Sequence, residues 1–134
     1  MHAIELLNTI KAPASQVMRT LSTEAGLAAI WTKKLKVKPE INHVHEFDFD
    51  EGYITKMKLV TLTESQMVWE CIESDEDWTG TQVVFDLSEK DGVTTVVLRH
   101  KNWRSMNDYF RFCSYHWAML LYRLKMYCES KNQE

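Results

Sequence analysis

The residues of this chain that could carry chemistry are chiefly histidines and cysteines. His100 follows Val96 and Leu98 at intervals of two, so in a strand it faces the same apolar side as they do. A histidine on such a face can contact a ligand or transfer a proton, although more often it is a hydrogen-bonded core residue. Catalysis would also need an acid or base beside it, and the inward pattern holds no second titratable group of that kind. We therefore predict no catalytic residue, and we favour a binding protein over an enzyme.

Four side chains could imitate a zinc site. His43 and His45 share one face of an expected strand, whereas Cys71 and His100 lie on the inward faces of other strands. Zinc needs ligands that converge on one point, and spacing on separate strands does not show such convergence. We therefore predict no metal site. The sequence also lacks a glycine-rich phosphate loop and the G-x-S-x-G and H-E-x-x-H motifs, so we predict no cofactor.

Cysteine usage indicates a reducing compartment. The three cysteines, Cys71, Cys113 and Cys128, are an odd number and form no C-x-x-C motif. The first residues also lack the basic stretch and apolar run that mark a signal peptide. We interpret the cysteines as reduced, buried thiols and expect a cytoplasmic protein.

The length and net charge of the chain argue against some classes of function. The chain has 134 residues, 45% of them hydrophobic, which predicts one domain over residues 1–134. Its net charge of −3 gives no broad basic field for nucleic acid. No apolar run approaches the ~20 residues that a membrane span needs. We therefore expect neither a nucleic-acid partner nor a membrane span.

Large apolar and aromatic side chains recur at positions expected to face inward. The candidate ligand-binding residues are Trp31, Phe47, Phe49, Met57, Trp69, Cys71, Phe85, Leu98, His100, Trp103, Tyr109, Phe110, Cys113 and Trp117. They could line an apolar cavity, with His100, Trp69, Trp103 and Tyr109 giving selectivity. They could equally fill the space themselves, because protein interiors are densely packed.

One long helix is expected to position these side chains, from Ser105 to Glu129. Ser105 is a candidate N-cap, with Asp108 completing a capping box. No proline or glycine interrupts the helix. Its apolar stripe is wide and aromatic, and it consists of Met106, Tyr109, Phe110, Cys113, Trp117, Leu120, Leu121, Leu124 and Cys128. Such a stripe must pack on another layer.

The rest of the chain is expected to form that layer. We predict a strand over 2–10, short helices over 13–21 and 24–30, and strands over 34–41, 44–50, 53–62, 67–73, 79–88 and 93–103. The lysines of 34–41 suit an edge strand better than a nucleic-acid patch, given the acidic net charge. Residues 74–77 are interpreted as a solvated acidic loop. Consecutive hairpins, such as the one at Asp91-Gly92, predict a curved antiparallel sheet in a two-layer α+β fold.

A second apolar stripe lies on the back of the long helix. It consists of Phe112, Tyr115, Met119, Tyr122 and Met126, at spacings of three and four. A helix held by a sheet on one side is normally polar on the other. Aromatic residues and methionine are enriched in interfaces, so this stripe predicts a homodimer.

The ordered motifs resemble the START-like superfamily, also called SRPBCC, across about residues 4 to 128. Within it, the similarity is to the branch named for activators of heat-shock-protein ATPases. The residues that carry the resemblance are Ile10 to Pro13, Val17, Leu21, Gly26-Leu27, Trp31, Phe47, Phe49, Trp69, Trp78 to Thr81, Gly92, Thr94-Thr95, His100, Trp103, Cys113, Trp117, Leu120, Leu121 and Leu124. The chain departs from the family at Ile30-Trp31, often two aromatic residues, and at Asn42-His43, where glycine is frequent.

The resemblance implies a helix-grip fold and three functions. The first is binding of a hydrophobic small molecule or lipid between the sheet and the C-terminal helix. The second is a co-chaperone-like module with a chaperone partner. The third is an enzyme of the cyclase or dehydratase kind. One fold hosts many functions, so the site must decide among them.

Overall fold

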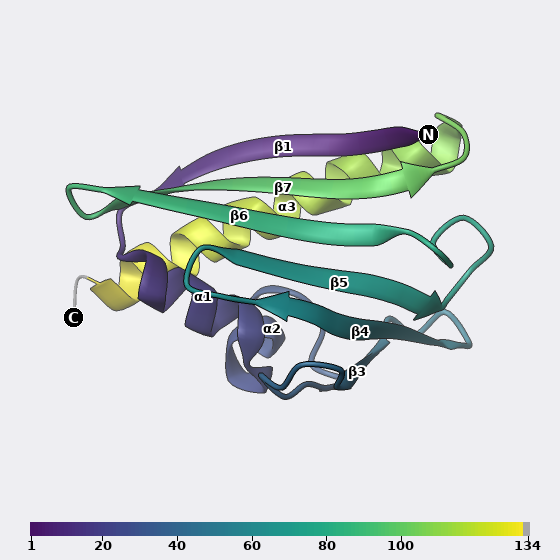
Figure 1. The fold of residues 1–134 in the computed structure, drawn as a ribbon, viewed down its shortest axis with the longest axis horizontal. Helices are drawn as coiled ribbons and strands as arrows, with labels where there is room; N and C mark the ends of the chain where they lie inside the picture. The colour runs from purple at the N-terminus through teal and green to yellow at the C-terminus, as the bar shows by residue number, and fades with distance from the viewer. Residues whose placement is uncertain (133–134) are drawn as a thin grey trace.

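The computed structural model describes residues 1–132, whereas Gln133 and Glu134 of the expected domain lie outside the described residues. The elements, in chain order, are β1 (His2–Ile10), α1 (Ala14–Ser22), α2 (Glu24–Ile30), β2 (Leu35–Lys36), β3 (Val44–Asp48), β4 (Ile54–Leu62), β5 (Gln66–Glu73), β6 (Gln82–Lys90), β7 (Val93–Trp103) and α3 (Asp108–Asn132) (Figure 1).

The strands form one curved antiparallel sheet in the order β1-β7-β6-β5-β4-β3-β2. The long helix α3 crosses one face of this sheet, and α1 and α2 lie together beside its C-terminal part (Figure 1). This arrangement confirms the expected α+β helix-grip fold. Along the described chain, no helix is both long and apolar enough to cross a bilayer.

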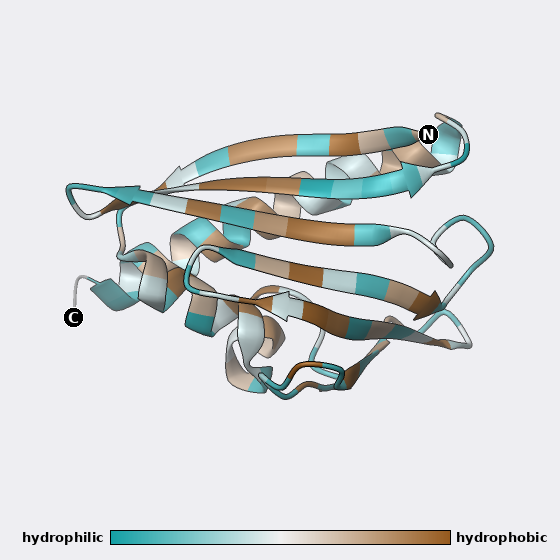
Figure 2. Ribbon diagram, viewed as in Figure 1, coloured by the Kyte–Doolittle hydropathy of each residue, from teal (hydrophilic) through white to brown (hydrophobic). Residues whose placement is uncertain are grey.

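Alternation along the strands builds the core. Hydrophobic and hydrophilic bands succeed one another along β4, β5 and β6 (Figure 2). On β7, Val96, Leu98 and His100 are buried at every second position, as their spacing predicts. From α3, Trp117 and Leu121 close the core against this face with the other buried residues of the predicted stripe.

The start of α3 differs from the sequence-based expectation. The helix begins at Asp108, and the side chain of Asn107 accepts a hydrogen bond from the Phe110 N–H at 2.8 Å. Asn107 is therefore the N-cap, and the prediction of Ser105 was wrong. Met106 precedes the helix and is 52% exposed, so it does not belong to the buried stripe. Asparagine and serine cap helices about equally well, and sequence alone does not choose between neighbours.

The second strand is much shorter than expected. Only Leu35–Lys36 pairs with β3, although the segment does form the sheet edge. The N–H of Val37 donates to the Glu24 carboxylate at 3.0 Å instead of to the sheet. Beyond it, Asn42 has a φ of 72°, which belongs to a turn.

The hairpin turns set the limits of β6. The strand was expected over 79–88 but begins at Gln82, because Gly80, with a φ of 91°, lies in a turn closed by the Thr81 N–H and the Trp78 carbonyl. At the other end, Asp91 and Gly92 have φ values of 53° and 78°. Positive φ at both positions is the geometry of a two-residue hairpin, as predicted.

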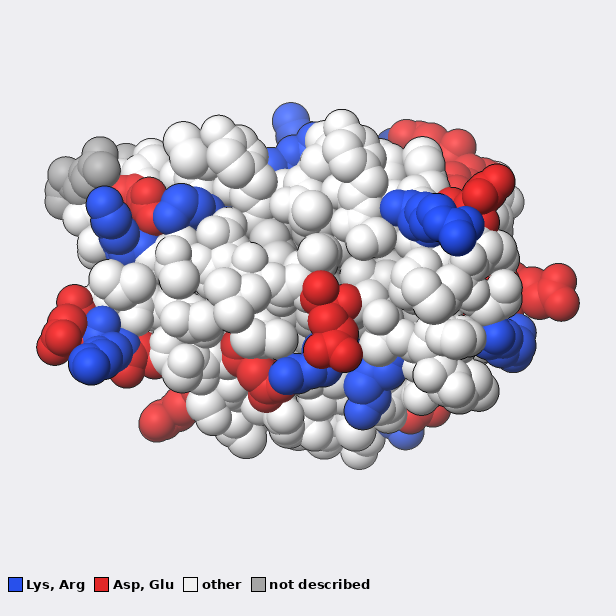
Figure 3. Space-filling model, turned by 90° about the horizontal axis from the view of Figure 1, so that it is seen from above, with Lys and Arg blue, Asp and Glu red and all other residues white. Residues whose placement is uncertain are grey.

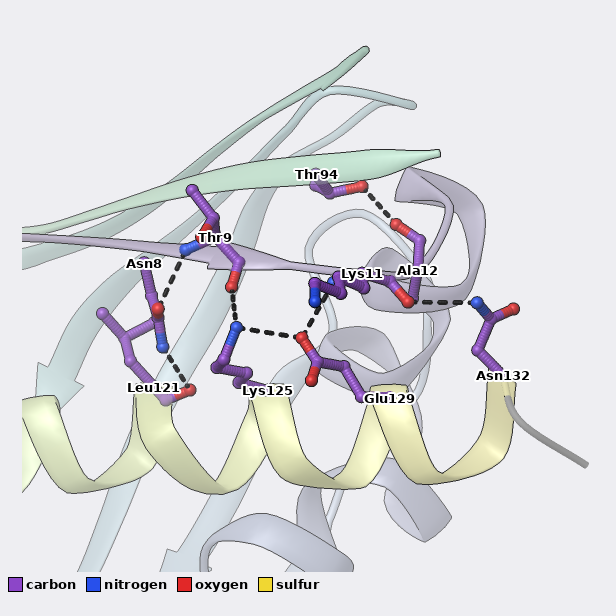
Figure 4. A network of polar contacts seen from close by, with 9 residues as sticks. All are labelled: Asn8, Thr9, Lys11, Ala12, Thr94, Leu121, Lys125, Glu129 and Asn132. Atoms are coloured by element: carbon purple, nitrogen blue, oxygen red, sulfur yellow. Dashed lines mark hydrogen bonds and ion pairs between the residues drawn. The ribbon is translucent and has the colours of Figure 1, made fainter. Parts of the chain in front are cut away.

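The outer edge of β1 is covered by side chains from α3 (Figure 4). Lys125 donates to the Thr9 carbonyl at 2.6 Å, and the Glu129 carboxylate accepts from the Lys11 N–H at 2.9 Å. Asn132 donates to the Lys11 carbonyl at 3.0 Å. An open strand edge invites pairing with another chain, and these bonds occupy part of that edge.

Candidate functional site

A pocket of about 290 Å³ opens where the start of α3 meets two loops of the sheet. Its lining residues are Trp31, Phe49, Glu51, Trp78, Tyr109, Phe112, Cys113, His116 and Trp117. Six of the nine are tryptophan, tyrosine or phenylalanine, so the pocket is mostly π surface. Two larger hollows, of about 520 and 810 Å³, lie beside α1, and Tyr127 is the one aromatic side chain in their linings. The aromatic pocket is therefore the candidate site for an apolar ligand.

Trp31 forms the wall between this pocket and the core. It follows α2 directly, and its N–H donates to the Leu27 carbonyl at 2.8 Å, which fixes the end of that helix. Its ring stacks on Trp69, with centroids 5.9 Å apart and planes 2° from parallel. It also meets Trp117 at 5.3 Å and Phe49 at 4.9 Å. Ring contacts of this kind hold the wall rigid.

His100 lies behind the pocket in a fully connected hydrogen-bond chain. The indole N–H of Trp117 donates to its Nδ1 at 3.0 Å. An indole nitrogen can only donate, so Nδ1 is unprotonated and the proton lies on Nε2. Nε2 then donates to the Thr81 hydroxyl at 2.8 Å, which in turn donates to the Trp78 carbonyl at 2.5 Å. Burial lowers the pKa of His100 to about 3, so the ring is neutral.

This chain of hydrogen bonds gives His100 a positioning role. Both ring nitrogens are committed to protein partners, so they have no hydrogen bond to offer a ligand. The partners at either end, Trp117 and Trp78, both line the pocket. His100 therefore holds two pocket walls in place, and its predicted contact with a ligand stays a prediction.

Asp75 anchors the loop on the other side of the pocket. Its carboxylate accepts hydrogen bonds from the hydroxyls of Tyr109 at 2.6 Å and Tyr53 at 3.3 Å, and from the Trp78 N–H at 2.8 Å. Burial and then Asp75 raise the pKa of Tyr53 to about 12 and that of Tyr109 further. Asp75 is half-buried, so residues 74–77 are not simply a solvated loop as expected.

The cysteines are buried thiols, as the sequence predicts. Cys113 is at the pocket floor and is 5% exposed, and its sulfur accepts from the Trp78 indole N–H at 3.4 Å. Burial raises its pKa to about 11 and that of Cys71 to about 12. Both are therefore protonated near neutral pH and are poor nucleophiles.

The predicted ligand-binding set divides into two groups. The pocket brings together Trp31, Phe49, Tyr109, Cys113 and Trp117. The others lie in the core, away from its lining, and they are Phe47, Met57, Trp69, Cys71, Phe85, Leu98, His100, Trp103 and Phe110. Each of these is 7% exposed or less, so the interior between sheet and helix is largely occupied by side chains.

Four lining residues were missed from the sequence: Glu51, Trp78, Phe112 and His116. For two of them, the helical spacing in the sequence already indicated a place in the site. Phe112 and His116 belong with Tyr109, Cys113 and Trp117 to one face of α3, at spacings of three and four. No comparable signal exists for Glu51, since it lies in a turn whose position depends on the tertiary fold.

His43 and His45 pair with each other. Their Nδ1 atoms are 2.8 Å apart. Burial, and then His43, lower the pKa of His45 to about 4. Within residues 1–132, no group of three or more His, Cys, Asp or Glu side chains is arranged to hold a metal ion.

Comparison with known proteins supports the fold. No family model and no curated protein matches the chain. Among solved structures, it is similar to the Aha1 dimer from Colwellia psychrerythraea, with a TM-score of 0.88 and 27% identity over 96% of this chain and 97% of the other. Protein MLL2253 from Mesorhizobium loti gives a TM-score of 0.79 at 16% identity, covering 93% and 95%. CalU16 from Micromonospora echinospora gives 0.73 at 17%, covering 93% and 73%. The chain therefore has the helix-grip fold of START-like (SRPBCC) proteins.

Proposed function

We propose that this protein binds a small, predominantly apolar molecule in the aromatic pocket beside α3. The observation that carries the proposal is the pocket of about 290 Å³ with six tryptophan, tyrosine and phenylalanine residues in its lining. Its volume is near the lower end of the ~300–1,000 Å³ usual for ligand sites, so the ligand is small. Because side chains fill the core behind the pocket, the ligand lies between α3 and the loops and not deep inside the sheet.

Binding without chemistry is the best-supported role. An enzyme of the cyclase or dehydratase kind would need an acid–base pair at the reacting group. Glu51 and His116 both line the pocket, but no hydrogen bond joins them in the described chain. The Cys113 thiol stays protonated near neutral pH, and the Tyr109 hydroxyl already donates its hydrogen bond to Asp75.

Tryptophan fluorescence gives a direct test, since three pocket residues are tryptophans. Titration with small aromatic compounds and short-chain lipids should change the emission and raise the melting temperature. Phe49→Ser removes one ring of the lining and should weaken binding by about fivefold to tenfold. Leu7→Ser, at a 65% exposed apolar residue on β1, is the matched control and should bind normally. If no compound changed the emission or the melting temperature of the wild type, the proposed binding would be wrong.

We also propose a homodimer formed through the back of α3. Phe112, Tyr115 and Tyr122 are 58%, 64% and 61% exposed, and Met126 is 50% exposed, whereas Met119 is half-buried. Seen from above the view of Figure 1, uncharged surface lies between separate groups of acidic and basic side chains (Figure 3). One structural neighbour is described as an Aha1 dimer. A two-fold axis would let each stripe pack against its own copy.

A chaperone partner has less support. It rests on the resemblance to activators of heat-shock-protein ATPases and on the neighbour described as an Aha1 dimer. A pull-down with the heat-shock chaperone, followed by an ATPase assay, tests it. An unchanged ATPase rate at saturating protein would dismiss this role.

A further inference from the structure

We infer that the ligand of the aromatic pocket is an organic cation, with a fully alkylated ammonium group seated among the rings. The inference rests on the proposed function and adds the charge of the ligand to it. Three features of the pocket carry it: the π surface of the lining, the use of the hydrogen-bond donors of three rings inside the protein, and the carboxylates around its mouth.

Three of the pocket rings use their hydrogen-bond donors inside the protein. Trp78 donates to the Cys113 sulfur, Trp117 donates to His100, and Tyr109 donates to Asp75. Each of these rings therefore presents carbon and π surface to the pocket. A cation over the face of tryptophan or tyrosine is attracted by the ring quadrupole, and tryptophan attracts it most strongly.

The loops around the pocket add negative charge. Residues 49–53 and 74–81 contain five carboxylates, Asp50, Glu51, Asp75, Glu76 and Asp77, and no lysine or arginine. Glu51 lines the pocket directly. The carboxylates of Asp75 and Glu51 also contribute, after burial, to the raised pKa of Cys113 at the pocket floor. A positive ligand is favoured by this field.

The basic side chains near these loops have partners of their own. Lys34 pairs with Asp50, and Arg111 pairs with Asp108 at 3.3 Å. Arg104 donates to the Glu76 carbonyl at 2.8 Å. In the described chain, no lysine or arginine lines the pocket itself. The cation among the rings would therefore come from the ligand.

The lining also discriminates between kinds of ammonium group. A primary ammonium carries three N–H donors, and each must find an acceptor when it leaves water. Besides the sulfur of Cys113, the side-chain acceptors in the lining are Glu51, His116 and the hydroxyl oxygen of Tyr109, which is held by its own hydrogen bond to Asp75. A trimethylammonium group has no donors to satisfy, and its methyl groups pack against carbon. Alkylated ammonium ions should therefore bind more tightly than primary ones.

Choline and its uncharged carbon isostere, 3,3-dimethyl-1-butanol, are the probes that test the inference. They have the same shape and differ in charge. We expect choline to bind about tenfold more tightly, which is the size of a partly desolvated cation–π contribution. Ethanolamine, the primary ammonium analogue, should bind more weakly than choline. High salt should reduce the affinity for choline and leave that for the alcohol unchanged.

Glu51→Gln should lower the affinity for choline severalfold and leave that for the alcohol unchanged. Glu51 is exposed in a turn, so the variant should fold, and its melting temperature checks this. Glu64→Gln, in the β4–β5 turn at the other end of the sheet, is the matched control (Figure 1). Equal affinity for choline and the alcohol would overturn the cation inference and leave the proposed function standing. Failure of choline, the alcohol and the neutral aromatic compounds to bind would overturn both.

Discussion

The indole of Trp117 donates its one hydrogen bond to His100, 3.0 Å away, while its ring lines the aromatic pocket. Trp117 therefore belongs both to the buried chain of hydrogen bonds through His100 and to the surface that a ligand would touch. Because that chain continues through Thr81 to the backbone of Trp78, it fixes two pocket walls relative to β7.

Replacing His100 should destabilise the fold more than its size suggests. His100→Leu replaces the imidazole with an apolar side chain of similar volume. It leaves the Trp117 N–H without an acceptor, whereas the Thr81 hydroxyl keeps the Trp78 carbonyl as its acceptor. A buried unpaired group costs about 1–3 kcal/mol, so we expect a loss of about that size in the free energy of unfolding. Urea denaturation measures it. His116→Leu, at an exposed histidine, should cost less than 1 kcal/mol. An equal effect of the two changes would show that the polar chain contributes no stability.

Stability should fall as the pH is lowered from about 7 to 5. The pKa values of His100 and His45 are lowered to about 3 and about 4 in the folded protein, against about 6.5 in the unfolded chain. In this range the unfolded state binds more protons, so lowering the pH favours unfolding. Each histidine should contribute about 2 kcal/mol of loss by pH 5. Urea midpoints at several pH values test this, and His100→Gln should reduce the slope while His116→Gln should not.

The fold was readable from the sequence where one local pattern decided the outcome. Alternation placed Val96, Leu98 and His100 inward, and Asp91-Gly92 predicted its hairpin. The limits of β2 escaped prediction because Val37 donates to Glu24 of a separate helix. Only the tertiary fold brings those two residues together.

The candidate site was less predictable than the fold. Periodicity indicates which side chains face inward, but it does not say whether they line a cavity or fill it. Trp69 and Trp31 face the same core, yet only Trp31 reaches the pocket. Glu51 joins the site from a turn, where no periodicity applies. A pocket made by the end of a helix and two loops depends on loop geometry that hydrophobic patterns do not encode.

Asn107 should contribute to the stability of α3, and Ser105 should not. Asn107→Ala removes the side-chain acceptor of the Phe110 N–H and should cost about 1 kcal/mol. Ser105→Ala should change the free energy of unfolding by less than about 0.5 kcal/mol, because Ser105 is exposed and precedes the helix. Thermal or urea denaturation of the two variants separates them. A larger loss for Ser105→Ala would place the helix start where the sequence first suggested it.

A homodimer formed through the apolar stripe on α3 should dissociate into monomers when charged residues are introduced into that stripe. Met119→Lys combined with Tyr122→Glu places two charges in the centre of the proposed interface, where the cost of desolvating them should separate the subunits. Sedimentation should show a dimer for the wild type and a monomer for the double variant at micromolar concentration. Ile72→Lys, at a residue 41% exposed on β5, is the matched control and should remain dimeric. A wild type that sediments as a monomer would show that the stripe is simply exposed surface.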